Sequence, residues 1–339
     1  MILLDALYIN NSGGKVLLDY LVKKFEESDL QVFYLFDIRL KGNYTTIKED
    51  NHVLFLEASI KNRKQFYKTN KDKFSKVFCF GNLPPNIKLN ATVYTYLHQT
   101  YYLEFTKNVS FKFKALFMLK RILWKFFSKN TDFWIVQTNL MQKKLSNKIG
   151  ILFNRILVLP FYEINRIKSD NYIKRNHQSF LYVSNAPIHK NHEFLINGFC
   201  KFYDVEKSGS LTLTISKEFP HLLSLIEDKK QEGYPIYNVG FVDKEFVTRL
   251  FQESEYTVYP SLTESFGLGL IEGIENGCKI IGADLPYTYA VCKPSLVFNP
   301  NDVDSLVEAL KNTKDYSSVL PSSQLVENKI DYIIELFKK

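Results

Sequence analysis

Cysteine and long apolar runs are both scarce in this sequence of 339 residues, and each scarcity excludes a class of protein. The four cysteines lack Cys-x-x-Cys spacing, which argues against a zinc site and against a disulfide framework; they are Cys79, Cys200, Cys278 and Cys292. No uninterrupted apolar stretch reaches the roughly 20 residues that a membrane-spanning helix needs. The chain opens without a basic lead, which predicts a first strand and not a signal peptide. We therefore expect a protein of the reducing cytoplasm.

Charge of one sign is not in large excess, since 44 lysines and arginines oppose 36 aspartates and glutamates, a net charge of +8. This modest basic excess fits an anionic partner such as nucleotide phosphates or an acidic lipid surface. No basic run is interleaved with polar base-reading side chains, so we expect no nucleic-acid partner. The chain has 45% hydrophobic and 24% charged residues, which is an ordinary globular composition. Its length predicts two domains.

The first half of the chain has the pattern of a doubly wound α/β domain. A nearly continuous apolar strand over residues 2–9 leads into a loop with Gly13 and Gly14, then a helical pattern and a second strand over 31–36. The glycine pair lets backbone approach a ligand closely, although the Gly-x-Gly-x-x-Gly fingerprint of dinucleotide sites is missing. A later strand over 92–97 ends at His98, which predicts a histidine at the ligand-binding edge of a parallel sheet. A plain βα turn and a structural histidine remain alternatives.

The second half repeats this pattern with two loops suited to phosphate. A strand over 180–183 leads into a loop with Lys190 and then a helix. A strand ending at Tyr259 leads into a loop with Glu264 and then a helix that opens near Gly267. Free N–H groups and the positive dipole at such a helix start favour an anion. A carboxylate there repels phosphate and suits sugar hydroxyls, from which it accepts hydrogen bonds. An ordinary βα turn with surface glutamates is the alternative.

The stretch from Tyr259 to Gly277 resembles the Glu-x7-Glu signature of the large family-four group of retaining glycosyltransferases, which have the GT-B fold. The residues that carry the likeness are Pro260, Ser261, Glu264, Phe266, Gly267, Leu268, Glu272, Asn276 and Gly277. The resemblance implies an α/β protein of two Rossmann-like domains that face each other across a cleft. It also implies an acceptor-side domain over 1–162, a nucleotide-sugar domain over 163–320 that follows a polar linker, and a C-terminal helix within 321–339 that packs on the first domain.

The resemblance assigns roles to individual residues. His98, Lys190 and Glu264 are expected to be catalytic, with His98 beside the transferred sugar, Lys190 on the diphosphate and Glu264 on the sugar hydroxyls. The expected donor-binding residues are Gly13, Gly14, Asn185, Lys190, Val242, Glu264, Ser265, Phe266, Gly267, Leu268, Gly269 and, on the ribose, Glu272. The family has an arginine where this chain has Asn185, so one positive charge of the phosphate site is missing. The resemblance implies no cofactor and no metal.

The implied activity is transfer of a hexose-type sugar from a nucleoside-diphosphate sugar to a saccharide hydroxyl, with retention of configuration. The acceptor is expected to be lipid-linked, in bacterial O-antigen or capsule synthesis. Two alternatives remain open: a GT-B sugar-nucleotide 2-epimerase and a non-catalytic nucleotide-sugar-binding subunit, which the missing arginine favours. His189 and His192 resemble a pair of metal ligands, but no carboxylate or cysteine stands at ligand spacing with both, so we expect no metal there.

Two further segments carry predictions. Residues 107–129 form a basic amphipathic pattern, with Phe113, Phe117 and Trp124 on one face and Lys114, Arg121 and Lys125 on another. Such a helix lies on an anionic membrane or packs its apolar face on the core, and both interpretations stay open. Asp302-Val-Asp304 matches a metal-binding Asp-x-Asp, but we interpret the segment as helix capping, with Ser305 and Glu308 as a capping box.

Overall fold

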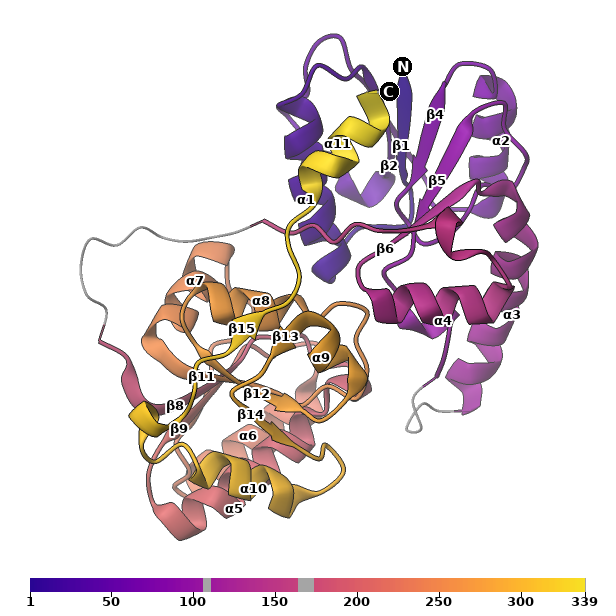
Figure 1. Ribbon diagram of the computed structural model, residues 1–339. Helices are drawn as coiled ribbons and strands as arrows, with labels where there is room; N and C mark the ends of the chain where they lie inside the picture. The colour runs from indigo at the N-terminus through magenta and orange to yellow at the C-terminus, as the bar shows by residue number, and fades with distance from the viewer. Residues whose placement is uncertain (106–110, 164–173, 339) are drawn as a thin grey trace. The chain divides into compact units, whose positions relative to one another are not determined.

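The computed structural model describes residues 1–105, 111–163 and 174–338 and divides the chain into two compact units (Figure 1). Of the described residues, unit 1 contains 1–105, 111–163 and 327–338, and unit 2 contains 174–326. Most of the predicted linker, 164–173, lies outside the described residues, as does the start of the predicted basic helix at 107–110.

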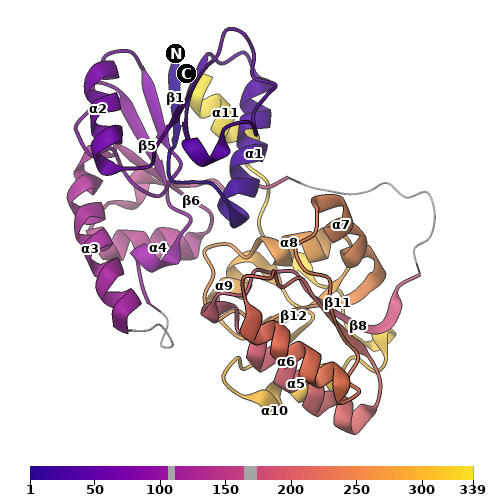
Figure 2. The same ribbon diagram turned by 180° about the vertical axis from the view of Figure 1, so that it is seen from behind.

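Unit 1 is a seven-stranded parallel sheet with helices on both faces. The strand order is β3-β2-β1-β4-β5-β6-β7, with α1 and α11 on one side of the sheet and α2 on the other (Figure 1, Figure 2). The strands are β1 Ile2–Ala6, β2 Val32–Asp37, β3 His52–Leu56, β4 Lys76–Cys79, β5 Thr92–Tyr96, β6 Phe133–Val136 and β7 Ile156–Val158. The helices are α1 Ser12–Glu26, α2 Ile60–Asn70, α3 Phe111–Phe127, α4 Asn139–Ile149 and α11 Ile330–Lys338.

Unit 2 has a six-stranded parallel sheet in the order β10-β9-β8-β11-β12-β14 and a small antiparallel pair, β13 with β15. The strands are β8 Asn176–Tyr182, β9 Ser210–Leu213, β10 Ile236–Asn238, β11 Ser254–Tyr259, β12 Lys279–Ala283, β13 Cys292–Lys293, β14 Leu296–Phe298 and β15 Ser323–Gln324. The helices are α5 His192–Glu206, α6 Pro220–Gln231, α7 Lys244–Glu253, α8 Leu268–Glu275, α9 Pro286–Val291 and α10 Val303–Lys311. The sequence pattern missed β13 and β15, because two-residue strands carry no periodicity.

The C-terminal helix α11 belongs to unit 1, where it lies beside α1 (Figure 1). Phe337 of this helix is 3% exposed, and its ring centroid lies 5.0 Å from that of Phe78 and 5.2 Å from that of Tyr94. The residues just before this helix, 321–326, belong to unit 2 instead, because β15 pairs with β13 there. The last turn of the chain therefore completes the core that covers β4 and β5.

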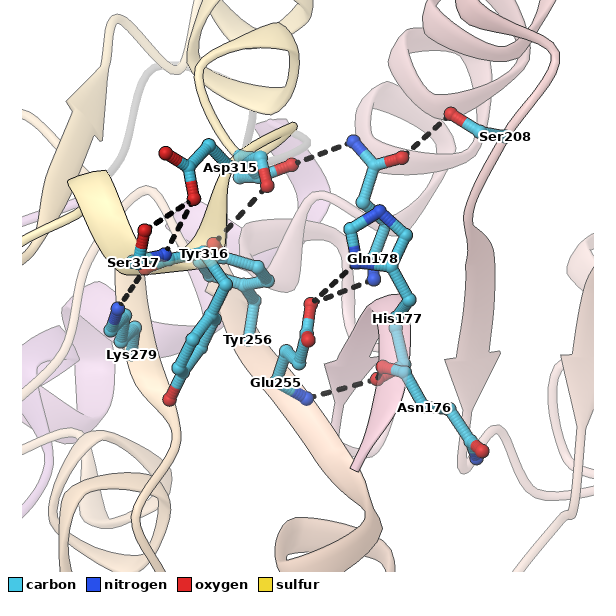
Figure 3. Close-up of polar contacts among 12 residues, drawn as sticks. Asn176, His177, Gln178, Ser208, Glu255, Tyr256, Lys279, Asp315, Tyr316 and Ser317 are labelled. Atoms are coloured by element: carbon cyan, nitrogen blue, oxygen red, sulfur yellow. Dashed lines mark hydrogen bonds and ion pairs between the residues drawn. The ribbon is translucent and has the colours of Figure 1, made fainter. Parts of the chain in front are cut away.

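A polar cluster at the amino end of β8 and β11 fixes the pairing of these two strands (Figure 3). The register shifts there, and the Glu255 carboxylate accepts the backbone N–H of Gln178 at 2.7 Å. Gln178 has a left-handed backbone (φ +47°), and its side chain donates to Thr313 Oγ1 at 3.2 Å. The cluster links the register shift between β8 and β11 to the segment after α10, and so has a structural role. It lies at the edge opposite to the loops that follow the strands.

The capping prediction for α10 was partly wrong. Asp302 is the N-cap, and its carboxylate accepts from the backbone N–H groups of Asp304 at 3.0 Å and Ser305 at 3.4 Å. Ser305 lies inside the helix, and its hydroxyl accepts from the backbone N–H of Asn299. Capping does explain this acidic segment, but the aspartate caps the helix in place of the predicted serine.

Candidate functional site

The strand order of unit 2 brings the two phosphate-suited loops together. β8 and β11 are neighbours in the sheet, while the chain leaves β8 toward β9 on one side and β11 toward β12 on the other. Ligands bind at such a switch point, outside the carboxyl ends of the two strands, because the loops diverge there. Lys190 follows β8 and Glu264 follows β11, so the topology makes neighbours of residues 74 positions apart.

Lys190 and Glu264 form a direct ion pair. The Lys190 ammonium lies 2.6 Å from Glu264 Oε1, and the two side chains are 18% and 11% exposed. The ammonium also lies 5.7 Å from the centre of the Tyr259 ring. The sequence analysis assigned the lysine to phosphate and the glutamate to sugar hydroxyls, without a contact between them. The pair keeps both charges compensated although the two side chains are mostly buried.

Neighbouring hydrogen bonds hold the two loops in register. The backbone N–H of Leu262 donates to the His189 carbonyl at 2.8 Å, which joins the loop after β11 to the loop after β8. Tyr182 is fully buried, and its hydroxyl donates to the Lys190 carbonyl at 3.1 Å and lies 2.9 Å from the Ser261 hydroxyl. Tyr287 donates to the Ser261 carbonyl at 2.7 Å. Buried tyrosines therefore hold the two loops that carry the ion pair.

The two glycines at the start of α8 are required for different structural reasons. Gly267 is the N-cap with a left-handed φ of +80°, a conformation that favours glycine over any residue with a Cβ. Gly269 has no such φ, but a Cβ there would lie 3.1 Å from the Tyr259 ring. Between the ion pair and these glycines, Ser265 is half-buried, and Phe266 is buried. Leu268 opens the helix, so backbone N–H groups stand at the same edge as the ion pair.

Glu272 lies in the middle of α8, and its environment favours the protonated acid. Burial raises the pKa of Glu272 to about 7, while the positive charge of Lys244 at the start of α7 acts in the opposite direction. A carboxyl of this kind changes its charge near neutral pH.

The remaining predicted residues of unit 2 lie in loops that follow strands, as Lys190 and Glu264 do. Asn185 is half-buried in the loop that leads to Lys190, and its carbonyl accepts from the Ser184 hydroxyl at 2.7 Å. Val242 follows β10 and precedes α7. His189 and His192 do not belong to a metal-ligand group, because no cluster of three or more ligating side chains occurs within the described ranges.

Unit 1 has its own switch point between β1 and β4. Gly14 lies in the first turn of α1 after β1, and a Cβ built on it would lie 3.2 Å from the imidazole Cε1 of His98. A Cβ on Gly13 would meet nothing within 4 Å. The predicted glycine and histidine are therefore in contact, and only the second glycine faces the ring.

The side chain that the sequence analysis missed in unit 1 is Asn82. It follows β4, is 5% exposed and has a left-handed φ of +65°. Its amide lies 2.9 Å from His98 Nε2. The Gly81-Asn82 pair after an apolar strand is a turn signal, but a turn signal does not reveal which side chain it orients.

The helix α3 presents a wide apolar surface that the core of unit 1 does not cover. Phe117, Trp124 and Phe127 face the core, whereas large apolar side chains elsewhere on the helix are exposed: Phe111 by 86%, Leu119 and Ile122 by 62%, Leu116 and Phe126 by 59%. Arg121 does not belong to a free basic face, because its guanidinium donates to the Tyr101 carbonyl at 2.7 Å and stacks over Phe105. Within the described residues, no helix combines the length and hydropathy needed to cross a bilayer.

Comparison with known proteins identifies the family that unit 2 resembles. Residues 177–314 match the family described as Glycosyl transferases group 1. The chain is 26% identical over 173 residues to the O-antigen chain mannosyltransferase RfbU of Salmonella typhimurium, which covers 49% of this chain and 44% of the relative. The chain thus spans about half the length, or less, of the curated relatives it matches.

Solved structures extend the likeness to the whole chain. Sucrose-phosphate synthase of Thermosynechococcus elongatus superposes with a TM-score of 0.74 at 15% identity, over 99% of this chain and 94% of that one. HepE of Anabaena, solved in complex with UDP-glucose, gives a TM-score of 0.67 at 10% identity, over 99% and 97%. The chain therefore has the α/β fold of the GT-B glycosyltransferases, with its second unit similar in sequence to Glycosyl transferases group 1.

Proposed function

We propose that the protein is a retaining glycosyltransferase that moves a hexose-type sugar from a nucleoside-diphosphate sugar to a saccharide hydroxyl. The observation that carries the proposal is the ion pair of Lys190 and Glu264 at the switch point of unit 2, beside the start of α8. One cation for the diphosphate and one carboxylate for sugar hydroxyls stand together where a nucleotide sugar needs both. The match of residues 177–314 to Glycosyl transferases group 1 supports this assignment.

In the proposed reaction, donor binding separates the ion pair. Lys190 turns from Glu264 to the diphosphate, and Glu264 becomes free to accept hydrogen bonds from the sugar. The bond between the anomeric carbon and the phosphate oxygen breaks, and the acceptor oxygen forms a bond to that carbon on the same face. The acceptor proton passes to an oxygen of the leaving phosphate. Lys190 and the N–H groups at Gly267 to Leu270 stabilise the charge that develops on the diphosphate.

The proposal gives Asn185 a defined consequence. An arginine at this position would bring a second full charge to the diphosphate, and an asparagine offers a neutral hydrogen bond. We propose that no metal ion replaces the missing charge. The reaction should then proceed in the presence of a chelator at an unchanged rate.

The test is turnover with a panel of nucleotide sugars and saccharide acceptors, with and without a lipid anchor on the acceptor. Lys190→Ala and Glu264→Ala should each lower kcat at least ~100-fold, which is typical when one charge-stabilising group is removed. Lys201→Ala, at an exposed ion pair on α5, is the control and should leave kcat unchanged. Turnover of both site variants at near the normal rate would exclude the assignment.

The same panel separates two other functions. A sugar-nucleotide 2-epimerase would convert the donor without an acceptor, and a non-catalytic subunit would bind it without turnover. The name of one relative favours transfer, since RfbU is an O-antigen chain mannosyltransferase. We therefore propose a saccharide acceptor of bacterial surface polysaccharide synthesis, O-antigen or capsule.

We further propose that α3 places the protein peripherally on an anionic membrane surface of the cytoplasm, where a lipid-linked acceptor would lie. The exposed apolar residues of this helix alternate with exposed lysines, among them Lys112, Lys120 and Lys125. Lysines attract acidic headgroups while apolar side chains enter the acyl boundary, and this combination supports a lipid partner.

Vesicle flotation tests the membrane proposal. Leu119→Glu combined with Ile122→Glu should abolish binding to vesicles with acidic lipids, and Lys120→Glu should weaken it in a salt-dependent manner. Val205→Glu, at another exposed apolar position (61%), is the control and should bind normally. Dimer formation through α3, with vesicle binding unchanged in the variants, would exclude a lipid surface as the partner.

A further inference from the structure

Two hydrogen bonds with Asn82 decide the protonation of His98. The backbone N–H of His98 donates to Asn82 Oδ1 at 2.8 Å. A backbone N–H can only donate, so the atom that receives it must be the amide oxygen. The other end of the amide, the NH₂ group, then lies 2.9 Å from His98 Nε2. An amide NH₂ can only donate, so Nε2 must be the accepting, unprotonated nitrogen of the ring.

The conformation of Asn82 leaves its amide little freedom to turn. Its backbone is in the left-handed region (φ +65°), which asparagine tolerates better than most residues. Its carbonyl accepts from the indole N–H of Trp124 at 3.1 Å, and Trp124 is 1% exposed. The core of unit 1 therefore holds the backbone on one side of Asn82, and the backbone of His98 holds its side chain on the other.

The surroundings of the ring agree with a neutral imidazole. Phe80 and Tyr96 stack against it, each with its centroid 5.5 Å from that of the ring. Burial lowers the pKa of His98 to about 4, and a hydrogen bond to the Phe80 backbone opposes the shift. Tyr96 brings no charge, since burial raises its own pKa well above the usual value. A protonated Nε2 would direct its hydrogen at the NH₂ hydrogens of Asn82, which is a repulsive contact.

We propose that Asn82 is a positioning residue that holds His98 as the neutral tautomer with its proton on Nδ1. In the proposed glycosyl transfer, His98 would then act without gaining or losing a proton. The ring serves as a fixed neutral surface whose Cε1 edge faces Gly14. The catalytic consequence rests on the proposed glycosyl transfer, but the tautomer itself does not.

Nitrogen NMR of the imidazole rings tests the proposal directly. Protein with ¹⁵N-labelled histidine has six labelled rings, and the signals missing in His98→Gln are those of His98. We expect Nε2 to have the shift of an unprotonated, accepting nitrogen throughout pH 5 to 8. Protonation of Nε2 in the wild-type protein at pH 7 would overturn the proposal.

Asn82→Asp changes the donor into a charged acceptor at nearly constant shape. It should move the proton of the ring to Nε2 at pH 7, because a carboxylate can only accept a hydrogen bond. It should also raise the pKa of His98 from about 4 by at least ~2 units, because an adjacent carboxylate favours the imidazolium. Asn82→Gly keeps the left-handed backbone and should give a mixture of tautomers. Asn154→Asp, an exposed residue of the same unit, is the matched control and should leave both nitrogen signals unchanged. Unchanged signals in Asn82→Asp and Asn82→Gly would refute the role of the amide.

Activity measurements distinguish the role of Asn82 from the proposed glycosyl transfer. Asn82→Asp should lower kcat ~10-fold or more with little change in donor KM, and Asn154→Asp should leave both constants unchanged. A wild-type protein that transfers no sugar would refute the proposed function, while the nitrogen signals would still decide the role of Asn82. Normal kcat in an Asn82→Asp protein with protonated Nε2 would refute the need for an unprotonated Nε2.

Discussion

The strongest test of the site is the energetic coupling between Lys190 and Glu264. At a separation of 2.6 Å and an effective dielectric constant of about 20, the attraction is about 6 kcal/mol before desolvation is subtracted. Desolvation offsets most of this, because the two side chains are 18% and 11% exposed. Removing one partner, however, leaves the other charge poorly solvated. We expect Glu264→Gln to lower the free energy of unfolding of unit 2 by ~2 kcal/mol.

A double-mutant cycle isolates the pair from other effects of each substitution. Lys190→Met should cost a similar amount to Glu264→Gln, and the double variant should cost clearly less than the sum of the two. The expected coupling energy is ~1–2 kcal/mol. Asp304→Asn, which removes one partner of an exposed ion pair on unit 2, is the control and should change stability by less than ~0.5 kcal/mol.

The positions of the two tryptophans allow the unfolding of unit 1 to be followed separately from that of unit 2. Both tryptophans of the chain, Trp124 and Trp134, lie in unit 1. Urea unfolding followed by tryptophan fluorescence therefore reports unit 1, and circular dichroism reports both units. The variants should move the dichroism transition of unit 2 and leave the fluorescence midpoint unchanged. Additive effects of the two substitutions, with no coupling, would refute the ion pair as a feature of the folded protein.

Three further predictions concern other parts of the chain. Gly14→Ala should lower transfer ~10-fold, because its Cβ would press on the histidine ring at 3.2 Å; normal transfer by this variant would contradict the close approach. Phe337→Ala should destabilise unit 1 by ~3–5 kcal/mol in fluorescence-detected unfolding, whereas Tyr332→Ala, 68% exposed on the same helix, should cost less than ~0.5 kcal/mol; similar costs would show that α11 does not pack as described. For Glu272 the folded pKa of about 7 exceeds the usual 4.5, so its contribution to stability is present below pH 4.5 and lost as the pH rises through 7. Glu272→Gln should therefore raise the melting temperature at pH 8 and not at pH 4, and a pH-independent difference would exclude this explanation.

The sequence predicted the local structure of the site well, because each element there has a local cause. The apolar run before Tyr259, the polar loop and the glycines before the helix predicted a strand, a loop and a helix start at nearly the observed positions. The resemblance to retaining glycosyltransferases rests on the same short stretch. The α/β fold with two doubly wound sheets follows from alternating strand and helix patterns, and the structure confirms it.

Contacts between segments far apart in the chain were not available to this reasoning. Strand order decides which loops meet, and periodicity does not reveal strand order, so the pairing of Lys190 with Glu264 was missed. The contact between Asn82 and His98 was missed for the same reason, since it arises because β4 and β5 are neighbours in the sheet. Arg121 shows the opposite error. Its helical position suggested a free basic face, but the Tyr101 carbonyl lies within its reach.

The sequence by itself therefore determined the two α/β halves, the glycine at the start of α8 and the residue types suited to phosphate and sugar. These depend on interactions within a few residues, which leave periodic or positional traces. Only the tertiary structure decided that the phosphate lysine is held by the sugar carboxylate, and that an asparagine sets the proton of His98. Both depend on the angle and distance between groups from separate strands, and these are fixed when the sheets assemble.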